Sequence, residues 1–204
     1  MIKNILWDFD GVILDSMKIK GDGFVELFSY CTKEQTDSLF TYHFLHGGVS
    51  RFEKIRFFYK EILNKSIEED QVLKLADRFG DIVTTKLSKQ ENLIQDSVKF
   101  IQNNYTKYNF HIVSGAEEKE LQLICSELDL TKYFKSIQGS PTKKKVLVTT
   151  LLHTYNYKKS ETILIGDAVT DYDAALNNGI VFFGYNNQEL KSHNYIESFS
   201  GFQP

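Results

Sequence analysis

Hydrophobic and polar residues along the chain predict two kinds of element. Short apolar runs of strand length alternate with longer segments in which apolar residues recur every three or four positions, the period of an amphipathic helix. From residue 91 onward the alternation is regular, which predicts parallel strands joined by helices. The expected strands are 2–8, 109–113, 136–138, 162–165 and 180–183, and the expected helices of this part are 96–104, 117–128, 144–154 and 171–177.

The stretch between about residues 15 and 90 has a different pattern. Segments such as RFEKIRFFYKEIL and EDQVLKLADRFGDIVTTKL show helical spacing and no strand signal. We therefore expect an α/β protein in which a Rossmann-like parallel-sheet core is interrupted by an all-helical cap. The core would comprise residues 1–15 and 91–204 and the cap residues 16–90, joined at polar segments that could serve as hinges.

Composition excludes several classes of function. The 204 residues are 42% hydrophobic and 25% charged, as is usual for a globular protein, and a net charge of −3 without a basic stripe argues against a nucleic-acid partner. No apolar run reaches membrane-span length and the N-terminal segment has no signal-peptide pattern, so we expect a cytoplasmic protein. Cys31 and Cys125 belong to no Cys/His cluster, which predicts reduced thiols and no zinc site.

Four aspartates follow predicted strands. Asp8 and Asp10 come at the end of the first strand, where uncompensated charge would be costly to bury, and Asp167 and Asp171 follow the strand 162–165. Ligands of parallel α/β sheets bind at the carboxyl ends of the strands, so these carboxylates should meet at one edge. Clustered carboxylate oxygens are the ligands that Mg²⁺ prefers, and the sequence therefore predicts a magnesium site there.

The same edge should carry groups that suit a phosphate. Ser114 and Gly115 end the strand 109–113, and lysines 143 to 145 follow the strand 136–138. A hydroxyl, backbone N–H groups and an ammonium group all bind phosphate oxygens, while an aspartate can attack phosphorus and form an aspartyl-phosphate. A cation and a lysine would offset the repulsion between carboxylate and phosphate.

Four motifs together resemble the haloacid dehalogenase-like phosphohydrolases, in the branch with a helical cap after the first strand. The motifs are DFDGVILDS, HIVSG, a lysine after GSPTKK, and ILIGDAVTDYDAA, and they occur in the order of the family. Any one of them is a weak signal, but four in order, each beside a predicted strand, form a strong one. They cover both ends of the expected core.

The resemblance implies a role for each motif residue. Asp8 would be the nucleophile, and Asp10 the general acid and then the base that activates water. Ser114, Gly115 and Lys144 would bind the phosphoryl group; the spacing after GSP favours Lys144, with Lys143 as the alternative and Lys145 as a solvated residue at the start of the helix. Asp8, Asp167 and the main-chain carbonyl of Asp10 would bind Mg²⁺, and Asp171 would be a further ligand or would support one.

The expected cap carries one more motif. HGGVSRFEK, residues 46–54, resembles the cap loop of β-phosphoglucomutase and related sugar phosphatases, in which the arginine contacts a second phosphate of the substrate. Arg51 would then bind a phosphate or a carboxylate, since its planar fork suits either; the alternative is a surface salt bridge. The mutase also has a histidine shortly after its first motif that restrains hydrolysis, and Lys20 stands at that position here.

We therefore expect an Mg²⁺-dependent phosphatase that acts on a small phosphorylated metabolite, such as a sugar phosphate or a phosphoglycolate-like acid. A phosphosugar mutase is one alternative, and a non-catalytic phosphate-binding module is another. Dehalogenase activity is not expected, because the dehalogenases of the family need no metal and Asp10, Asp167 and Asp171 retain the acids of a metal site. The sequence identifies neither the substrate nor the oligomeric state.

Overall fold

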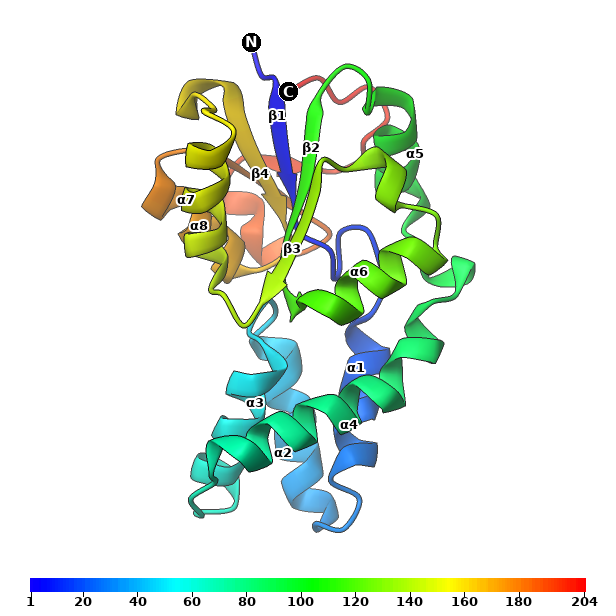
Figure 1. The fold of residues 1–204 in the computed structure, drawn as a ribbon, viewed down its shortest axis with the longest axis vertical. Coiled ribbons are helices and arrows are strands. Elements are labelled where there is room, and N and C mark those ends of the chain that lie inside the picture. The colour runs from blue at the N-terminus through cyan, green and yellow to red at the C-terminus, as the bar shows by residue number, and fades with distance from the viewer.

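A parallel six-stranded sheet forms the upper half of the molecule in Figure 1, a computed structural model that describes residues 1–204. Its strand order is β3-β2-β1-β4-β5-β6, and every neighbouring pair is parallel. The first strand of the chain is thus central, so the residues that follow it lie in the middle of one edge. The strands are β1 (Asn4–Trp7), β2 (Asn109–Glu117), β3 (Ser136–Ser140), β4 (Thr162–Gly166), β5 (Val181–Tyr185) and β6 (Tyr195–Ile196).

Helices cover both faces of this sheet. Successive strand residues point to opposite faces, so Ile5 and Trp7 pack into one hydrophobic cluster and Leu6 into the other. Helices α5 (Gln95–Asn104) and α6 (Glu118–Glu127) contribute to the first cluster, and α7 (Lys144–Thr154) and α8 (Val169–Asn178) to the second. All four residues of β1 are buried, as expected of a strand covered on both faces.

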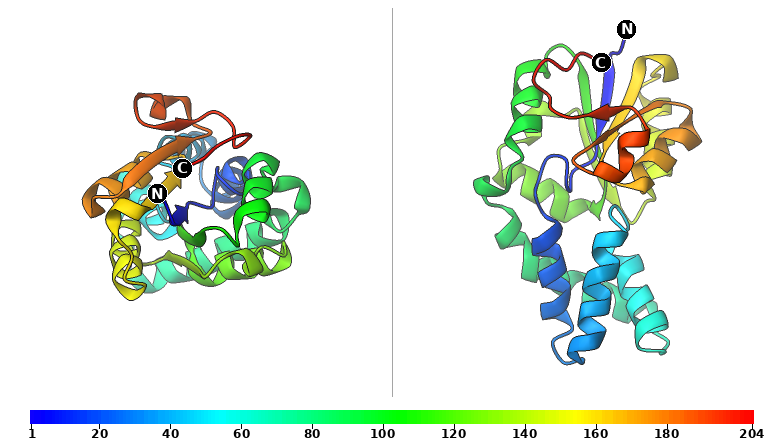
Figure 2. Two further views of the ribbon diagram at one scale, coloured as in Figure 1. Left: turned by 90° about the horizontal axis from the view of Figure 1, so that it is seen from above. Right: turned by 180° about the vertical axis from the view of Figure 1, so that it is seen from behind.

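A separate group of helices lies beyond the carboxyl edge of the sheet, in the lower half of Figure 1 and in the rear view of Figure 2. It comprises α1 (Met17–Leu27), α2 (Lys33–Leu45), α3 (Arg51–Phe57), which continues into a π-helical turn at Phe58–Ile62, and α4 (Glu69–Leu87). In α4 the buried side chains recur every three or four residues, which is why this segment forms an amphipathic helix. We call α1–α4 and their connections the cap.

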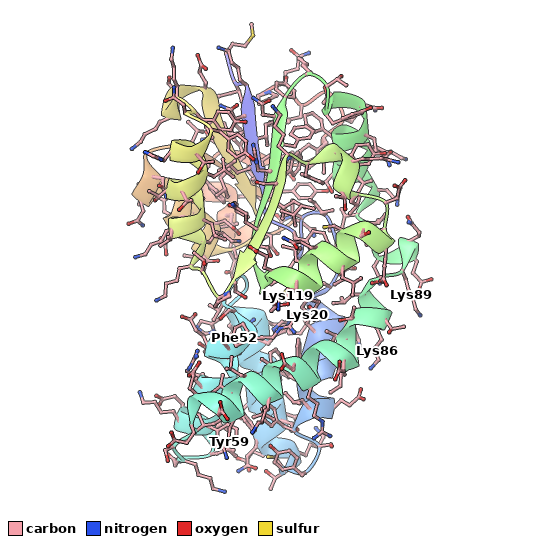
Figure 3. All side chains as sticks on the ribbon, viewed as in Figure 1. Lys20, Phe52, Tyr59, Lys86, Lys89 and Lys119 are labelled. Carbon is pink, nitrogen blue, oxygen red and sulfur yellow. The ribbon has the colours of Figure 1, made fainter.

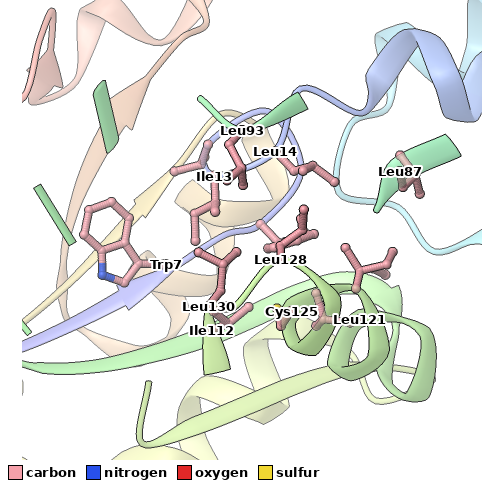
Figure 4. Close-up of a cluster of buried hydrophobic side chains, with 14 of the residues drawn as sticks. Trp7, Ile13, Leu14, Leu87, Leu93, Ile112, Leu121, Cys125, Leu128 and Leu130 are labelled. Carbon is pink, nitrogen blue, oxygen red and sulfur yellow. The ribbon is translucent and has the colours of Figure 1, made fainter. Parts of the chain in front are cut away.

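One apolar cluster joins the cap to the sheet. It contains 35 buried residues, among them Trp7 of β1, Phe79 of α4 and Leu121 of α6. Figure 4 shows part of this cluster, including Leu87 at the end of α4, Leu14, and Leu121 of α6. The cap is therefore packed on the core at this end.

The fold class predicted from the sequence is confirmed, and the predicted elements differ from the structure in detail. β2 continues to Glu117 instead of ending at Val113, with an irregular register beyond Val113, and the short strand β6 was not predicted. A bulged strand end and a two-residue strand are both too short to produce a periodic pattern. The exact division into residues 1–15, 16–90 and 91–204 stays a prediction. None of the helices has the length and apolar character needed to cross a membrane.

The packing of the hydrophobic core can be tested at Trp7. Its ring is fully buried and lies against Phe100, Phe110 and Phe199, with centroid separations of 5.3–6.0 Å. We expect Trp7→Ala to lower the free energy of unfolding by about 3–5 kcal/mol, because it opens a cavity among rings that cannot all move inward. Urea unfolding followed by circular dichroism measures the change. Leu123→Ala, at a half-exposed position, is the control; an equally small loss in both variants would contradict the assignment.

Candidate active site

The predicted catalytic residues meet at the carboxyl edge of the sheet, beneath the cap. Asp8 directly follows β1, and its backbone N–H donates to the Ile165 carbonyl of β4 over 2.9 Å. Asp167 directly follows β4, and Asp171 lies in the first turn of α8. The pairing of the two central strands therefore brings the first and fourth motifs together.

Gly11 allows the loops that follow β1 and β4 to come this close. Its φ is +73°, in the left-handed region that favours glycine. A Cβ at this position would also collide with the Asp167 carboxylate. The glycine of the first motif is thus required both by the turn after Asp10 and by the space that Asp167 occupies.

Lys144 joins two of the carboxylates. Its Nζ lies 2.9 Å from Asp8 Oδ1, and it forms an ion pair and hydrogen bond with Asp171. The second oxygen of Asp171 accepts from the Ala168 N–H over 3.1 Å, so Asp171 both closes the start of α8 and holds the lysine. Burial alone lowers the pKa of Lys144, but Asp171 and Asp8 outweigh it and raise the pKa above its usual value. The lysine is therefore a permanent cation of the site.

Negative charge still exceeds positive charge around Asp8. Burial raises the pKa of Asp8 to about 7, and the neighbouring Asp171 adds to the effect. Burial also raises the pKa of Asp167, with Asp8 as the next cause, and the Asp167 side chain has no ion-pair partner. Both carboxylate oxygens of Asp8 are buried, and apart from the approach of Lys144 to Oδ1 they have no polar partner.

These features fit a divalent cation. Oxygen atoms of Asp8, Asp167 and Asp171 all lie within 4.8 Å of one another, and carboxylate oxygens are the ligands that Mg²⁺ prefers. A cation there would give the buried Asp8 oxygens a ligand and relieve the repulsion that adds to the effect of burial on the pKa values. The Asp10 carboxylate lies outside this group, so its expected contribution through the main-chain carbonyl stays a prediction.

Asp10 instead faces Lys20 and Ser16 of the cap side. Both of its carboxylate oxygens lie 2.6 Å from Lys20 Nζ, and Ser16 Oγ donates to Oδ1 over 2.5 Å. Figure 3 shows Lys20 at the level where α1 approaches α6. Burial acts to raise the pKa of Asp10, but the Lys20 ammonium outweighs it and holds the pKa below its usual value. Asp8 and Asp10, two residues apart, thus have opposite shifts.

Ser114 and Gly115 lie in the irregular end of β2, where a bulge redirects the chain next to the site. Ser114 is fully buried, and its Oγ accepts from the Ala116 N–H over 3.1 Å. A Cβ at Gly115 would collide with the carbonyl of Gly48 in the cap loop. Glycine at this position therefore allows the cap loop to approach the phosphate-binding strand end that the sequence predicts.

Arg51 is buried at the boundary between cap and core. Its guanidinium forms an ion pair with Glu120 of α6, donates to the Ala76 carbonyl over 3.2 Å and lies 4.9 Å from the centre of the Phe79 ring. The predicted contact with substrate does not fully describe this geometry, because the guanidinium is already paired with Glu120. The alternative of a surface salt bridge does not fully describe it either, because the pair is buried. The arginine faces the site, yet its fork is already occupied.

Comparison with known proteins identifies the family. A family model described as haloacid dehalogenase-like hydrolase matches residues 5–185. The chain belongs to this family of hydrolases. A phosphoglycolate phosphatase from Vibrio parahaemolyticus serotype O3:K6 is 24% identical over 194 residues, which cover 90% of this chain and 83% of the relative.

Solved structures of the family show the same fold. β-Phosphoglucomutase from Clostridium difficile superposes with a TM-score of 0.79 at 18% identity, covering 100% of this chain and 94% of that one. A predicted phosphoglycolate phosphatase from Haemophilus somnus 129pt gives a TM-score of 0.74 at 15% identity, covering 98% and 95%. At these identities the likeness shows the fold, and the chemistry must be argued from the site of this hydrolase.

Two asparagines support the site of the hydrolase without having been predicted. Asn186 Nδ2 donates to the Gly11 carbonyl over 2.9 Å, and Asn187 Nδ2 donates to the Asp167 carbonyl over 2.7 Å. The pair follows β5, so it reaches the same edge as the motif residues. Its position after a predicted strand was the available signal, but asparagines are also common in ordinary turns.

The charge imbalance predicts how Mg²⁺ stabilises the protein. An Asp8 carboxyl whose pKa rises from 3.8 to about 7 on folding contributes stability below the lower value, which is lost as the pH rises through the higher one. At about pH 8 the ionised carboxylates repel one another and a cation relieves that repulsion, whereas at about pH 5 it must displace protons. We expect Mg²⁺ to raise the melting temperature more at the higher pH.

Differential scanning fluorimetry with and without Mg²⁺ at both pH values measures this effect. Asp167→Asn should abolish most of the Mg²⁺-dependent shift, while Asp81→Asn, at an exposed position of α4, should preserve it. An equal Mg²⁺ effect at both pH values in the unaltered protein would show that the site does not titrate as described.

Proposed function

We propose that this hydrolase is an Mg²⁺-dependent phosphatase that removes the phosphoryl group of a small phosphomonoester through an aspartyl-phosphate on Asp8. The observation that carries the proposal is the state of the Asp8 carboxylate. It is buried, and its one close polar partner is the Lys144 ammonium, 2.9 Å from Oδ1. The carboxylate oxygen that does not face Lys144 is free to attack phosphorus, and the adjacent cation can attract the phosphoryl oxygens toward it.

The first step forms a bond between an Asp8 oxygen and phosphorus and breaks the bond from phosphorus to the leaving oxygen. Asp10 donates a proton to that oxygen, so the product leaves as an alcohol. Lys144 and the N–H groups of the Ser114–Gly115 segment would bind the phosphoryl oxygens. Mg²⁺ held by Asp8, Asp167, Asp171 and the Asp10 carbonyl would supply positive charge against the negative charge of the reacting group.

The second step returns Asp8 to its starting state. Asp10, now a carboxylate, accepts a proton from water while the water oxygen attacks phosphorus and the bond to Asp8 breaks. Inorganic phosphate is released, and Asp10 is protonated for another cycle. The Lys20 ammonium favours the carboxylate form of Asp10, which suits this step and opposes the proton donation of the first step. Lys20 stands where the mutase of the family has a histidine that restrains hydrolysis, and this difference supports hydrolysis.

The comparisons support a small phosphorylated substrate. The relative from Vibrio parahaemolyticus is named for phosphoglycolate, and the cap resembles that of enzymes acting on sugar phosphates. The cap lies directly over the site, with Thr170 Oγ1 donating to the Gly47 carbonyl over 3.3 Å, so a bound substrate would be shielded from water. A sugar phosphate and a phosphoglycolate-like acid both satisfy this description.

A phosphosugar mutase is the second candidate, favoured by the structural likeness to β-phosphoglucomutase. A mutase must protect its phospho-enzyme from water until a second hydroxyl arrives. Phosphate release that depends on a bisphosphate activator, together with transfer between two positions of one sugar, would identify it. A non-catalytic phosphate-binding module would bind phosphomonoesters without turnover.

Asp8→Asn tests the proposed nucleophile. We expect phosphate release from the best phosphomonoester of a panel to fall by at least about 10³-fold, because the amide cannot form the covalent intermediate. The assay measures inorganic phosphate with and without Mg²⁺. Asp81→Asn, a charge-matched change on the exposed face of α4, should leave the rate unchanged. Full activity in Asp8→Asn would overturn the mechanism.

Lys20→Met tests the protonation of Asp10. Removing the ammonium raises the pKa of Asp10, so a step that uses the Asp10 carboxylate as base requires a higher pH. We expect the acid limb of the kcat profile to move to higher pH, provided that hydrolysis of the phospho-enzyme limits the rate. Lys18→Met removes an exposed lysine two residues away and should leave the profile in place. If the pH profile of kcat is the same for Lys20→Met and the unaltered protein, Lys20 does not control the protonation of Asp10.

A further inference from the structure

A cavity of about 40 Å³ lies between the cap and the core, next to the proposed reaction centre. Asp10 and Gly115 line its core side, so a ligand whose phosphoryl group rests on Asp8 can extend into it. Its cap side carries three basic side chains, Lys20, Arg51 and Lys54, each at least nine-tenths buried. Burying this much positive charge is costly unless anions compensate it.

Two of the three cations are compensated by the protein itself. Lys20 is held by both carboxylate oxygens of Asp10, and Arg51 is held by Glu120. Lys54 has no carboxylate partner, although its residue is only 3% exposed. Its hydrogen bond is to His43 Nδ1, over 2.9 Å.

Burial, with the Lys20 ammonium as the next cause, lowers the pKa of Lys54 to about 7, and the neighbouring groups fix the hydrogen bonds that Lys54 can make. His43 Nε2 lies 2.9 Å from the Met17 carbonyl, which can only accept, so Nε2 carries the hydrogen and Nδ1 has a lone pair. Lys54 therefore donates to a neutral histidine; burial, with Lys54 as the next cause, lowers the pKa of His43 to about 3. An ammonium group has three N–H donors, so two of those on Lys54 have no acceptor in the protein.

We propose that Lys54 binds a carboxylate of the substrate, so that the preferred substrate is a short phosphorylated carboxylic acid. The proposal rests on the phosphatase function proposed above and selects between its two substrate classes. The cavity beside Lys54 has room for a group of a few heavy atoms, such as a carboxylate. A carboxylate would supply the acceptors that Lys54 lacks and the negative charge that the cavity lacks.

Arg51 then has a different role from the one expected of it. Its pairing with Glu120 connects α3 of the cap to α6 of the core, and Thr84 Oγ1 of α4 donates to the second Glu120 oxygen over 3.3 Å. Arg51 and Glu120 hold the cap at the distance that puts Lys54 into the cavity. Arg51 is thus a positioning residue, and Lys54 is the residue that contacts substrate.

The experiment compares 2-phosphoglycolate with ethyl phosphate, which has the same length and a methyl group in place of the carboxylate. We expect Lys54→Met to lower kcat/KM for 2-phosphoglycolate by about 10–100-fold, the range of one charge-assisted hydrogen bond. For ethyl phosphate, the change should be less than about threefold. Lys60→Met, which removes a cap lysine whose side chain is 82% exposed, is the matched control and should alter neither substrate.

An equal loss for both substrates, or no loss for 2-phosphoglycolate, would overturn the assignment of Lys54. If Lys54→Met does not fold, as shown by the absence of a cooperative thermal transition, Lys54→Gln replaces it. Glutamine retains a donor for His43 Nδ1 and removes the charge, so the same loss confined to 2-phosphoglycolate is expected.

Failure of the proposed function has a separate signature. In that case the unaltered protein with Mg²⁺ hydrolyses neither compound, and calorimetric binding of the same two compounds takes the place of kcat/KM. Tighter binding of 2-phosphoglycolate than of ethyl phosphate, lost in the Lys54 variants, would still support the carboxylate site. Equal binding of the two compounds by the unaltered protein would overturn it.

Discussion

The repulsion among buried carboxylates at the carboxyl edge of the sheet is the constraint on which the rest of the site depends. Asp8, Asp167 and Asp171 are forced together by the pairing of β1 with β4 and by the start of α8. Lys144 compensates part of this charge, and burial together with the remaining repulsion raises the pKa values of Asp8 and Asp167. The folded protein therefore has an excess of negative charge at the position where a divalent cation and a phosphoryl group would react.

The position of β1 explains how the fold holds these carboxylates close together. β1 is central in the sheet and buried on both faces, and the chain around it is fixed by apolar contacts such as those of Trp7. Asn186 and Asn187 then fasten the loops that follow β1 and β4 through their carbonyl groups. Rigid strands and side-chain hydrogen bonds of this kind keep the carboxylates from moving apart, which is the condition for a preorganised site.

Much of this arrangement could be predicted from the sequence, because its signals are local. Apolar strands followed by Asp8, Asp167 and Ser114 identify the edge and its chemistry, and helical spacing identifies the cap. The partners of the cap residues could not be predicted in this way. Glu120 lies 69 residues from Arg51, and the contact between them depends on how the cap is set on the core. Lys54 has no signal of its own in the sequence, because its lack of a carboxylate partner appears only in three dimensions.

The charges of the cap complete the electrostatics of the core. Lys20 reaches Asp10 from α1, and Arg51 reaches Glu120 from α3, so each cation crosses the boundary to a core carboxylate. These two pairs draw the cap toward the core and leave Lys54 facing the cavity without an anion of the protein. A ligand that brings its own carboxylate would complete the pattern of pairs and favour the charged form of Lys54, whereas a ligand without one would leave Lys54 without an ion-pair partner. The selectivity proposed for this site thus follows from the same charge balance that closes the cap.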